Sequence, residues 1–230
     1  DGLGPEAIGI PELLARIDVP QILRKLFRDL AAGQAVQPSQ QLVEFPQGAG
    51  DFINYLGVLA EDGVYGIKTS PYIVREQGPL VTAWTLLMSM HTGQPLLLCD
   101  AGELTTARTA ATTAVAVDAL APQQATRLAI IGSGKVAQAH LHYVKGLRDW
   151  QDIRLHSPSL KGKTAAQREA LSALDPRLSL VDDLQSALHD ADVHGASMER
   201  CVHFDSEEEC RLRHDGDWRL RLAKVHTTKV

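Results

Sequence analysis

The apolar residues of the first half of the chain change from helical spacing to short alternating segments. Segment 11–35, PELLARIDVPQILRKLFRDLAAGQA, places large apolar residues three or four positions apart and predicts one helix that stops at Gly33. Short segments rich in β-branched and aromatic residues follow and predict strands: QQLVEFP, FINYLGVLA, VYGIKTS, LVTAWTLLMSM and TGQPLLLCDAGEL. The Ala- and Thr-rich run TTARTAATTAVAVDALA then predicts a long helix that ends near Pro122, with Thr105 or Thr106 as its N-cap.

The pattern changes again near residue 125. Strand-like runs alternate with amphipathic runs: RLAIIG, KVAQAHLHYVKGL, DIRLHS, KTAAQREALSAL, LSLVD and DLQSALHDA. Such alternation predicts a parallel sheet covered by helices. We therefore expect one domain at 1–124 and a second at 125–193, followed by segment 194–230, in which the alternation stops.

Composition narrows the class of partner. The 230 residues are 44% hydrophobic and carry a formal net charge of −5, which argues against nucleic acid or an anionic membrane surface as the partner. The 3 cysteines, Cys99, Cys201 and Cys210, are too few for a disulfide scaffold. With no leader and no apolar run of about 20 residues, we expect a soluble cytoplasmic protein.

A glycine turn opens the second domain. In IIGSGKVA the spacing is G-x-G-x-x-A, with Ala137 in the third position, and the turn follows a strand and opens a helix. Small residues at these positions allow a tight turn and bring a pyrophosphate to the helix N-terminus. The sequence therefore predicts a dinucleotide site built from Gly132, Ser133, Gly134, Lys135 and Val136.

The end of the next strand bears on which dinucleotide binds. An acidic residue there holds a free ribose 2′-hydroxyl, but IRLHSPSLKGK contains no carboxylate. Ser157, Ser159 and Lys161 suit a 2′-phosphate better, so we expect NADP in preference to NAD. The alternative is that Lys161 and Lys163 only solvate the next helix.

The segment L-T-x-x-R-T-A-A, followed by a strand and GSGKVA, resembles the ornithine cyclodeaminase/mu-crystallin family over about residues 15–193. This family contains ornithine cyclodeaminases, ketimine reductases and some alanine dehydrogenases. The resemblance implies an α/β protein: an N-terminal substrate and dimerisation domain, plus a Rossmann-type domain that is incomplete at its C-terminus here. It also implies a homodimer.

Three residues are candidates for substrate binding. The guanidinium of Arg108 lies in an Ala- and Thr-rich run and matches a carboxylate bidentately, unless it pairs with Asp100 or Glu103. The resemblance implies that Lys68 lies beside the substrate carboxylate, where it could orient the substrate or pass a proton; the alternative is a surface lysine on an edge strand. Gln40 stands near the place of a second family arginine and could donate a neutral hydrogen bond.

These residues favour hydride transfer to the C=N bond of a cyclic imino acid, with an amino acid or imino acid as the small-molecule partner. The alternatives are ammonia-eliminating cyclisation of ornithine type and an inactive, NADP-binding structural protein. Val136 occupies a position where relatives commonly carry glutamine.

No metal site is expected, because four tail residues match no standard zinc spacing: Cys201, His203, Cys210 and His214. No role can be assigned to three tail carboxylates: Asp205, Asp215 and Asp217.

Overall fold

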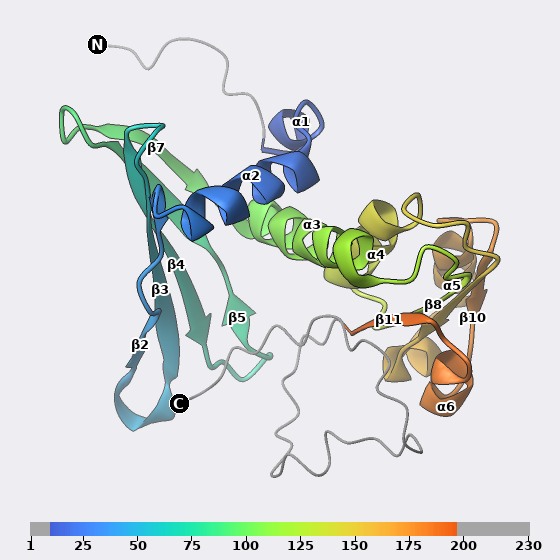
Figure 1. The fold of residues 1–230 in the computed structure, drawn as a ribbon. Helices are drawn as coiled ribbons and strands as arrows, with labels where there is room; N and C mark the ends of the chain where they lie inside the picture. The colour runs from blue at the N-terminus through green and yellow to red at the C-terminus, as the bar shows by residue number, and fades with distance from the viewer. Residues whose placement is uncertain (1–9, 197–230) are drawn as a thin grey trace. The chain divides into compact units, whose positions relative to one another are not determined.

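The computed structural model describes residues 10–196 of the chain. The chain divides into two compact units, residues 1–108 and 109–230, and each is described by itself (Figure 1). The first combines two helices with an antiparallel sheet, and the second combines helices with a parallel sheet. The mixed α/β class predicted from the sequence is confirmed. The predicted start of the second domain at residue 125 stays a prediction.

Two helices, and not the single predicted one, occupy the start of unit 1. They are α1 (Ile10–Leu14) and α2 (Val19–Ala31). The helical spacing of apolar residues continues across the break, but a new helix begins after Asp18. The Asp18 carboxylate accepts a hydrogen bond of 2.9 Å from the N–H of Gln21 and so caps α2. Pro20 lies in the first turn of α2, where its missing N–H costs nothing.

The described part of unit 1 contains a seven-stranded sheet. Its central order is β1-β3-β4-β6-β7; β2 also pairs with β3, and β5 with β4. β3 and β4 pair along their full ten-residue lengths. A short 3-10 turn, η1 (Pro46–Gly48), connects β2 and β3. The strands are β1 (Ala35–Val36), β2 (Gln41–Glu44), β3 (Gly50–Leu59), β4 (Val64–Ile73), β5 (Leu80–Val81), β6 (Trp84–Ser89) and β7 (Pro95–Asp100).

Helix α3 (Gly102–Leu120) begins earlier than the sequence predicts and ends near Pro122 as expected. Neither Thr105 nor Thr106 is its N-cap. Instead, the carboxylate of Asp100 accepts a hydrogen bond of 2.8 Å from the N–H of Gly102. Asp100 lies before the Ala- and Thr-rich run, so the run by itself predicts a helix start that is too late in the chain.

The guanidinium of Arg148 lies at the C-terminal end of α3. Its side chain is 2% exposed. It donates hydrogen bonds of 2.7–3.1 Å to five backbone carbonyls, those of Val117, Asp118, Ala121, Pro122 and Leu147. A buried arginine therefore satisfies the carbonyl oxygens that the end of a helix leaves unpaired.

The described part of unit 2 contains a four-stranded parallel sheet in the order β10-β9-β8-β11. Large apolar side chains between this sheet and its helices form a core around Trp150, Ile130 and Ile153. The strands are β8 (Arg127–Ile131), β9 (Asp152–His156), β10 (Leu178–Leu180) and β11 (Val193–Ala196). The helical segments are α4 (Lys135–Val144), η2 (Pro158–Gly162), α5 (Ala165–Ser172) and α6 (Leu184–Leu188). Among residues 10–196, no helix is long and apolar enough to cross a membrane.

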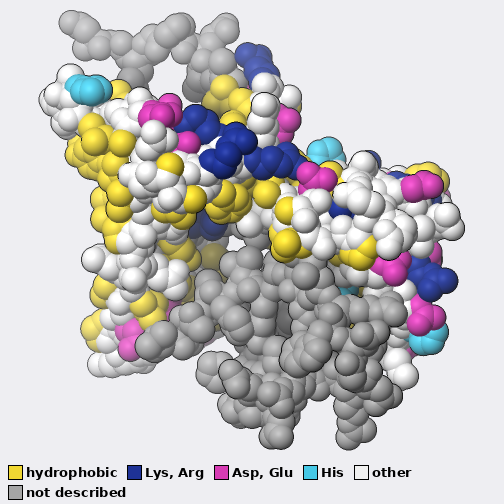
Figure 2. All heavy atoms as spheres, viewed as in Figure 1, with side chains coloured by type: hydrophobic (Ala, Val, Ile, Leu, Met, Phe, Trp, Pro, Cys, Tyr) yellow, Lys and Arg dark blue, Asp and Glu magenta, His cyan; other side chains and the backbone are white. Residues whose placement is uncertain are grey.

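Unit 1 leaves much more apolar surface exposed than unit 2. Among the described residues, nearly all the exposed large apolar side chains belong to unit 1, and Leu120 is the exception. Leu98 is 68% exposed and Trp84 46% exposed. Figure 2 shows hydrophobic side chains gathered over the sheet of this unit. Exposed apolar area of this kind is typical of a surface that contacts another molecule.

Candidate functional site

Lys68 and Arg108 lie against one aromatic ring. Lys68 on β4 is directly opposite Tyr55 on β3, so the two side chains share a face of the sheet. The Lys68 ammonium nitrogen lies 4.7 Å from the centre of the Tyr55 ring, and the central guanidinium carbon of Arg108 lies 6.0 Å from it. The structure thus brings together two of the three predicted substrate residues.

The strand position of Lys68 excludes one alternative reading. β4 lies between β3 and β6, so Lys68 is not on an edge strand. The side chain is half-buried, and its ammonium donates a hydrogen bond to the hydroxyl of Ser70. Two residues along one strand point to the same face, so this bond keeps the lysine on the Tyr55 side of the sheet.

Burial and like charge both act on this pair of cations. Burial and, to a lesser extent, the positive charge of Arg108 lower the pKa of Lys68 to about 8. Burial also lowers the pKa of Arg108, while Tyr55 opposes this shift. Two adjacent, partly desolvated cations favour an anion between them, and a carboxylate offers the geometry that a guanidinium binds best.

A buried hydroxyl lies one helical turn from Arg108. Thr105 precedes Arg108 by three positions on α3, so both side chains lie on one side of the helix. The Thr105 hydroxyl oxygen is buried and has no hydrogen-bond partner among the described residues. A buried hydroxyl left unpaired is costly, so Thr105 is available to donate to a ligand at this site.

Gln40, the third predicted substrate residue, has a less defined place. It is exposed and lies one residue before β2, whose first pair joins Gln41 to Asn54. Continuing this register by one position leads to Tyr55, the residue opposite Lys68. No hydrogen bond joins Gln40 to another residue in the range 10–196, so its predicted role stays a prediction.

The glycine turn of unit 2 has the predicted strand-turn-helix form. Gly132 follows β8 with a φ of 122°, a conformation that favours glycine. Gly134 is the N-cap of α4 and provides no capping side chain, which leaves the first N–H groups of the helix to an anionic ligand. Lys135 and Val136 are the first residues of α4. These features fit the pyrophosphate of a dinucleotide.

Three serine hydroxyls connect this turn to the end of β9. The Ser133 oxygen lies 2.8 Å from that of Ser159, which lies 2.9 Å from that of Ser157. Ser133 and Ser157 are buried, whereas Ser159 and Lys161 are exposed. Predicted residues from both segments therefore form one cluster, at the place where a Rossmann-type fold holds the adenosine ribose.

Unit 2 also contains a buried histidine for which the sequence predicts no specific role. His140 on α4 is 4% exposed, and its Nε2 lies 3.3 Å from the hydroxyl of Thr113 on α3. Burial lowers the pKa of His140, and the backbone of Thr109 opposes the shift. The Ala- and Thr-rich composition of α3 does not reveal such a pair. His140 therefore joins α3 to α4 as a neutral side chain near pH 7.

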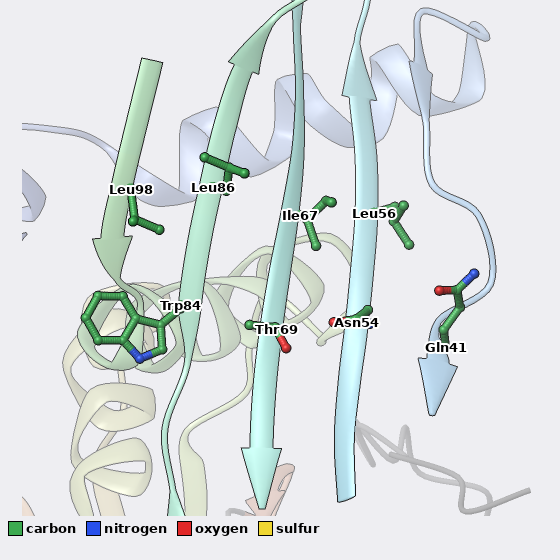
Figure 3. Close-up of a pocket in the computed structure, with 8 residues that line it drawn as sticks. All are labelled: Gln41, Asn54, Leu56, Ile67, Thr69, Trp84, Leu86 and Leu98. Atoms are coloured by element: carbon green, nitrogen blue, oxygen red, sulfur yellow. The ribbon is translucent and has the colours of Figure 1, made fainter. Parts of the chain in front are cut away.

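The opposite face of the unit 1 sheet carries a shallow apolar hollow of about 390 Å³. Figure 3 shows its side chains standing on one face of the sheet, with a helix behind the other face. Alternation along β4 places Ile67 and Thr69 in the hollow and Lys68 on the far side. The residues that line it are Gln41, Asn54, Leu56, Ile67, Thr69, Trp84, Leu86 and Leu98.

Comparison with known proteins identifies the family. The model of the ornithine cyclodeaminase/mu-crystallin family matches residues 8–197. The chain belongs to this family. The resemblance found in the sequence is confirmed, and the matched segment includes Lys68, Arg108 and the glycine turn.

Two curated relatives illustrate the similarity. The chain is 72% identical over 182 residues to the NAD(P)H-dependent anabolic L-arginine dehydrogenase DauB of Pseudomonas aeruginosa, covering 79% of this chain and 57% of that protein. It is 36% identical over 96 residues to the ornithine cyclodeaminase of Brucella suis, covering 40% of this chain and 27% of that protein. The chain thus spans little more than half the length of the first relative.

Solved structures agree on the fold. A Δ1-pyrroline-2-carboxylate reductase of Thermococcus litoralis, in complex with NADH and L-proline, matches with a TM-score of 0.69 at 24% identity, covering 77% of this chain and 56% of that one. An archaeal alanine dehydrogenase dimer with bound NAD matches with a TM-score of 0.69 at 23% identity, covering 82% and 59%. At these identities the matches establish a shared fold.

The tail residues considered for metal binding and acid–base chemistry, within 201–217, lie outside the described residues. Within 10–196, no group of histidine, cysteine and acidic side chains is arranged to hold a metal ion.

Proposed function

We propose that the protein acts in the NAD(P)H-dependent reduction of a 2-imino acid to an amino acid. The observation that carries the proposal is the pair of cations, Lys68 and Arg108, on the Tyr55 ring. The glycine turn and the open N-terminus of α4 support a dinucleotide in unit 2. Membership of the family and the name of the 72% identical relative support this class of reaction.

The proposed reaction assigns a role to each substrate residue. When bound, the reduced nicotinamide supplies a hydride to the carbon of the C=N bond. Arg108 holds the substrate carboxylate through two parallel hydrogen bonds, and the Thr105 hydroxyl donates a third. Lys68, with a pKa of about 8, is protonated at neutral pH and can give its proton to the imine nitrogen as the hydride arrives.

We propose a basic 2-imino acid, the one that gives L-arginine on reduction, as the first substrate to test. The support is that the 72% identical relative is an L-arginine dehydrogenase by name. The cyclic imino acid expected from the sequence is the second substrate to test. Cyclisation of ornithine with loss of ammonia is the competing reaction, and it has weaker support from a 36% identical relative.

We propose NADPH as the preferred cofactor. The support is the cluster of Ser133, Ser157 and Ser159, with Lys161 close in sequence and no carboxylate in 153–163. Three linked hydroxyls contain three protons and use two of them between themselves, so one proton remains to donate outward. A 2′-phosphate accepts that hydrogen bond and attracts the lysine, whereas a free diol benefits from a carboxylate.

We also propose that the active form is a homodimer and that a second copy covers the apolar hollow of unit 1. The support is the exposure of Ile67, Trp84 and Leu98 on one face of a sheet. Leu98→Glu should dissociate the dimer in light scattering, because it places a charge in the apolar contact. Lys163→Glu, on the surface of unit 2, is the control. A wild-type monomer at micromolar concentration would contradict the proposal.

The first experiment follows NADPH fluorescence during addition of three substrates. These are 5-guanidino-2-oxopentanoate with ammonia, Δ1-pyrroline-2-carboxylate and L-ornithine. Oxidation of NADPH with either of the first two supports reduction, and the faster one identifies the substrate. Because cyclisation begins with oxidation of the amino acid, ornithine is also tested with NADP⁺ and with NAD⁺ in place of NADPH; ammonia release without net reduction of the nucleotide would instead indicate cyclisation. Binding of NADPH without turnover of any of them would favour a nucleotide-binding protein without catalysis, the remaining alternative from the sequence.

A further inference from the structure

Tyr55 is the residue that Lys68 and Arg108 have in common. It lies in the middle of β3, and its ladder partner on β4 is Lys68. The ring centre lies 4.7 Å from the Lys68 nitrogen and 6.0 Å from the central carbon of the Arg108 guanidinium. One aromatic side chain therefore contacts cations from a strand and from a helix.

Elementary electrostatics explains why this arrangement is stable. The face of an aromatic ring carries partial negative charge and attracts a cation within about 6 Å, more strongly where water is excluded. Lys68 and Arg108 repel each other, and burial disfavours the charge on both. The Tyr55 ring is a neutral group that attracts both without competing with a substrate carboxylate for them. A carboxylate side chain in its place would pair with the cations and block the site.

We propose that Tyr55 is a positioning residue whose ring face holds the Lys68 ammonium and the Arg108 guanidinium together as a two-cation clamp for the substrate carboxylate. The clamp itself rests on the proposed function. The contact between Tyr55 and Lys68 can be measured without substrate or cofactor, so the two ideas can fail separately.

Few other groups in the same row of the sheet compete with the ring for Lys68. Thr85 on β6 is the other ladder partner of Lys68, and Cys99 on β7 pairs with Thr85. Burial and the nearby charge of Asp100 raise the pKa of Cys99, so its thiol is neutral near pH 7. The charge that acts on the pKa of Lys68 is that of Arg108. Of the other titratable groups, Tyr55 lies opposite Lys68 on β3, and Cys99 lies two strands away on β7.

The test compares Tyr55→Phe, which keeps the aromatic face, with Tyr55→Leu, which removes it. Competitive acetylation as a function of pH, read by mass spectrometry of the peptides, gives the titration midpoint of Lys68. Loss of the ring should lower this midpoint by about half a pH unit in Tyr55→Leu and leave it unchanged in Tyr55→Phe. Lys25, which pairs with Asp29 on α2, is the internal control in every sample.

Two results would overturn the proposal. One is an unchanged Lys68 midpoint in Tyr55→Leu, and the other is an equal shift in Tyr55→Phe, which would assign the effect to the hydroxyl. Tyr55→Met provides a second non-aromatic side chain if the leucine variant does not fold. In an active enzyme, Tyr55→Leu should raise KM for the imino acid about fivefold and leave NADPH affinity unchanged. If the Lys68 midpoints shift as expected but the protein reduces no imine, the proposed function is refuted and the contact between Tyr55 and Lys68 is still supported.

Discussion

The backbone N–H of Gly132 donates a hydrogen bond of 2.7 Å to the carbonyl oxygen of His156. This bond joins the glycine turn after β8 to the end of β9 and brings Ser133 within 2.8 Å of Ser159. The hydroxyl cluster of unit 2 therefore depends on a backbone contact between two adjacent parallel strands. Substitutions at Ser159 can change the chemistry of the cluster without disturbing the turn.

Ser159→Asp should reverse the cofactor preference. A carboxylate beside the ribose repels a 2′-phosphate and accepts hydrogen bonds from a diol, so the ratio of NADPH to NADH affinity should fall by about tenfold or more. Fluorescence titration with both nucleotides measures this ratio. Ser159→Ala, which removes the hydroxyl and adds no charge, is the matched control. An unchanged ratio in Ser159→Asp would place the ribose elsewhere.

Imine reduction should decline as the pH rises through about 8. The pKa of Lys68 lies near this value, and above it the side chain loses both its charge for the substrate carboxylate and its transferable proton. The profile of kcat/KM against pH tests this expectation. NADPH binding over the same range is the control, since unit 2 does not contain Lys68. A flat profile between pH 7 and 9 would remove Lys68 from the proton transfer.

Lys68→Met should abolish reduction and stabilise the fold. The pKa of Lys68 is lower in the folded chain than its ordinary value of 10.5, so the unfolded chain binds more protons between about pH 8 and 10.5, and stability rises with pH in that window. At pH 7 the folded chain bears the cost of a partly buried charge. Allowing for solvent screening, removal of this charge should raise the free energy of unfolding by about 1 kcal/mol and Tm by roughly 2–4 °C. A lower Tm in calorimetry would contradict this account.

Thr105→Val should weaken substrate binding selectively. Valine preserves the shape of threonine and removes the buried hydroxyl that has no described partner, so KM should rise about fivefold. Thr106→Val is the control, because the Thr106 hydroxyl donates to the backbone of Gly102 on the exposed side of α3. Steady-state kinetics distinguishes the two variants. Equal KM values would assign Thr105 a packing role only.

Arg148→Leu should destabilise unit 2 by about 3–5 kcal/mol, because it leaves several carbonyl oxygens at the end of α3 buried and unpaired. Urea unfolding measures the loss. Arg127→Leu is the control: its 3.9 Å ion pair with Asp190 is exposed and should contribute less than about 1 kcal/mol. Similar losses in both variants would show that the capping hydrogen bonds add nothing.

The sequence predicts most reliably those features that depend on neighbouring residues. The glycine turn is local, since its strand, turn and helix are consecutive, and the structure has all three. The break before α2 was missed because apolar spacing continues through Asp18, whose capping bond overrides it. The sequence does not reveal which residues contact Tyr55 and Arg148. Those contacts depend on strand register and helix packing, which bring together residues far apart in the chain.

The register of β3 and β4 determines which face of the sheet a substitution in β4 affects. Ile67 and Thr69 line the apolar hollow, while Lys68 between them contacts Tyr55 on the other side of a single layer of backbone. Substitutions at alternate positions of one strand can therefore alter the proposed dimer contact and the proposed substrate site separately. A slip of one residue would exchange the two sets of side chains, and the ten-residue pairing of β3 with β4 opposes that slip.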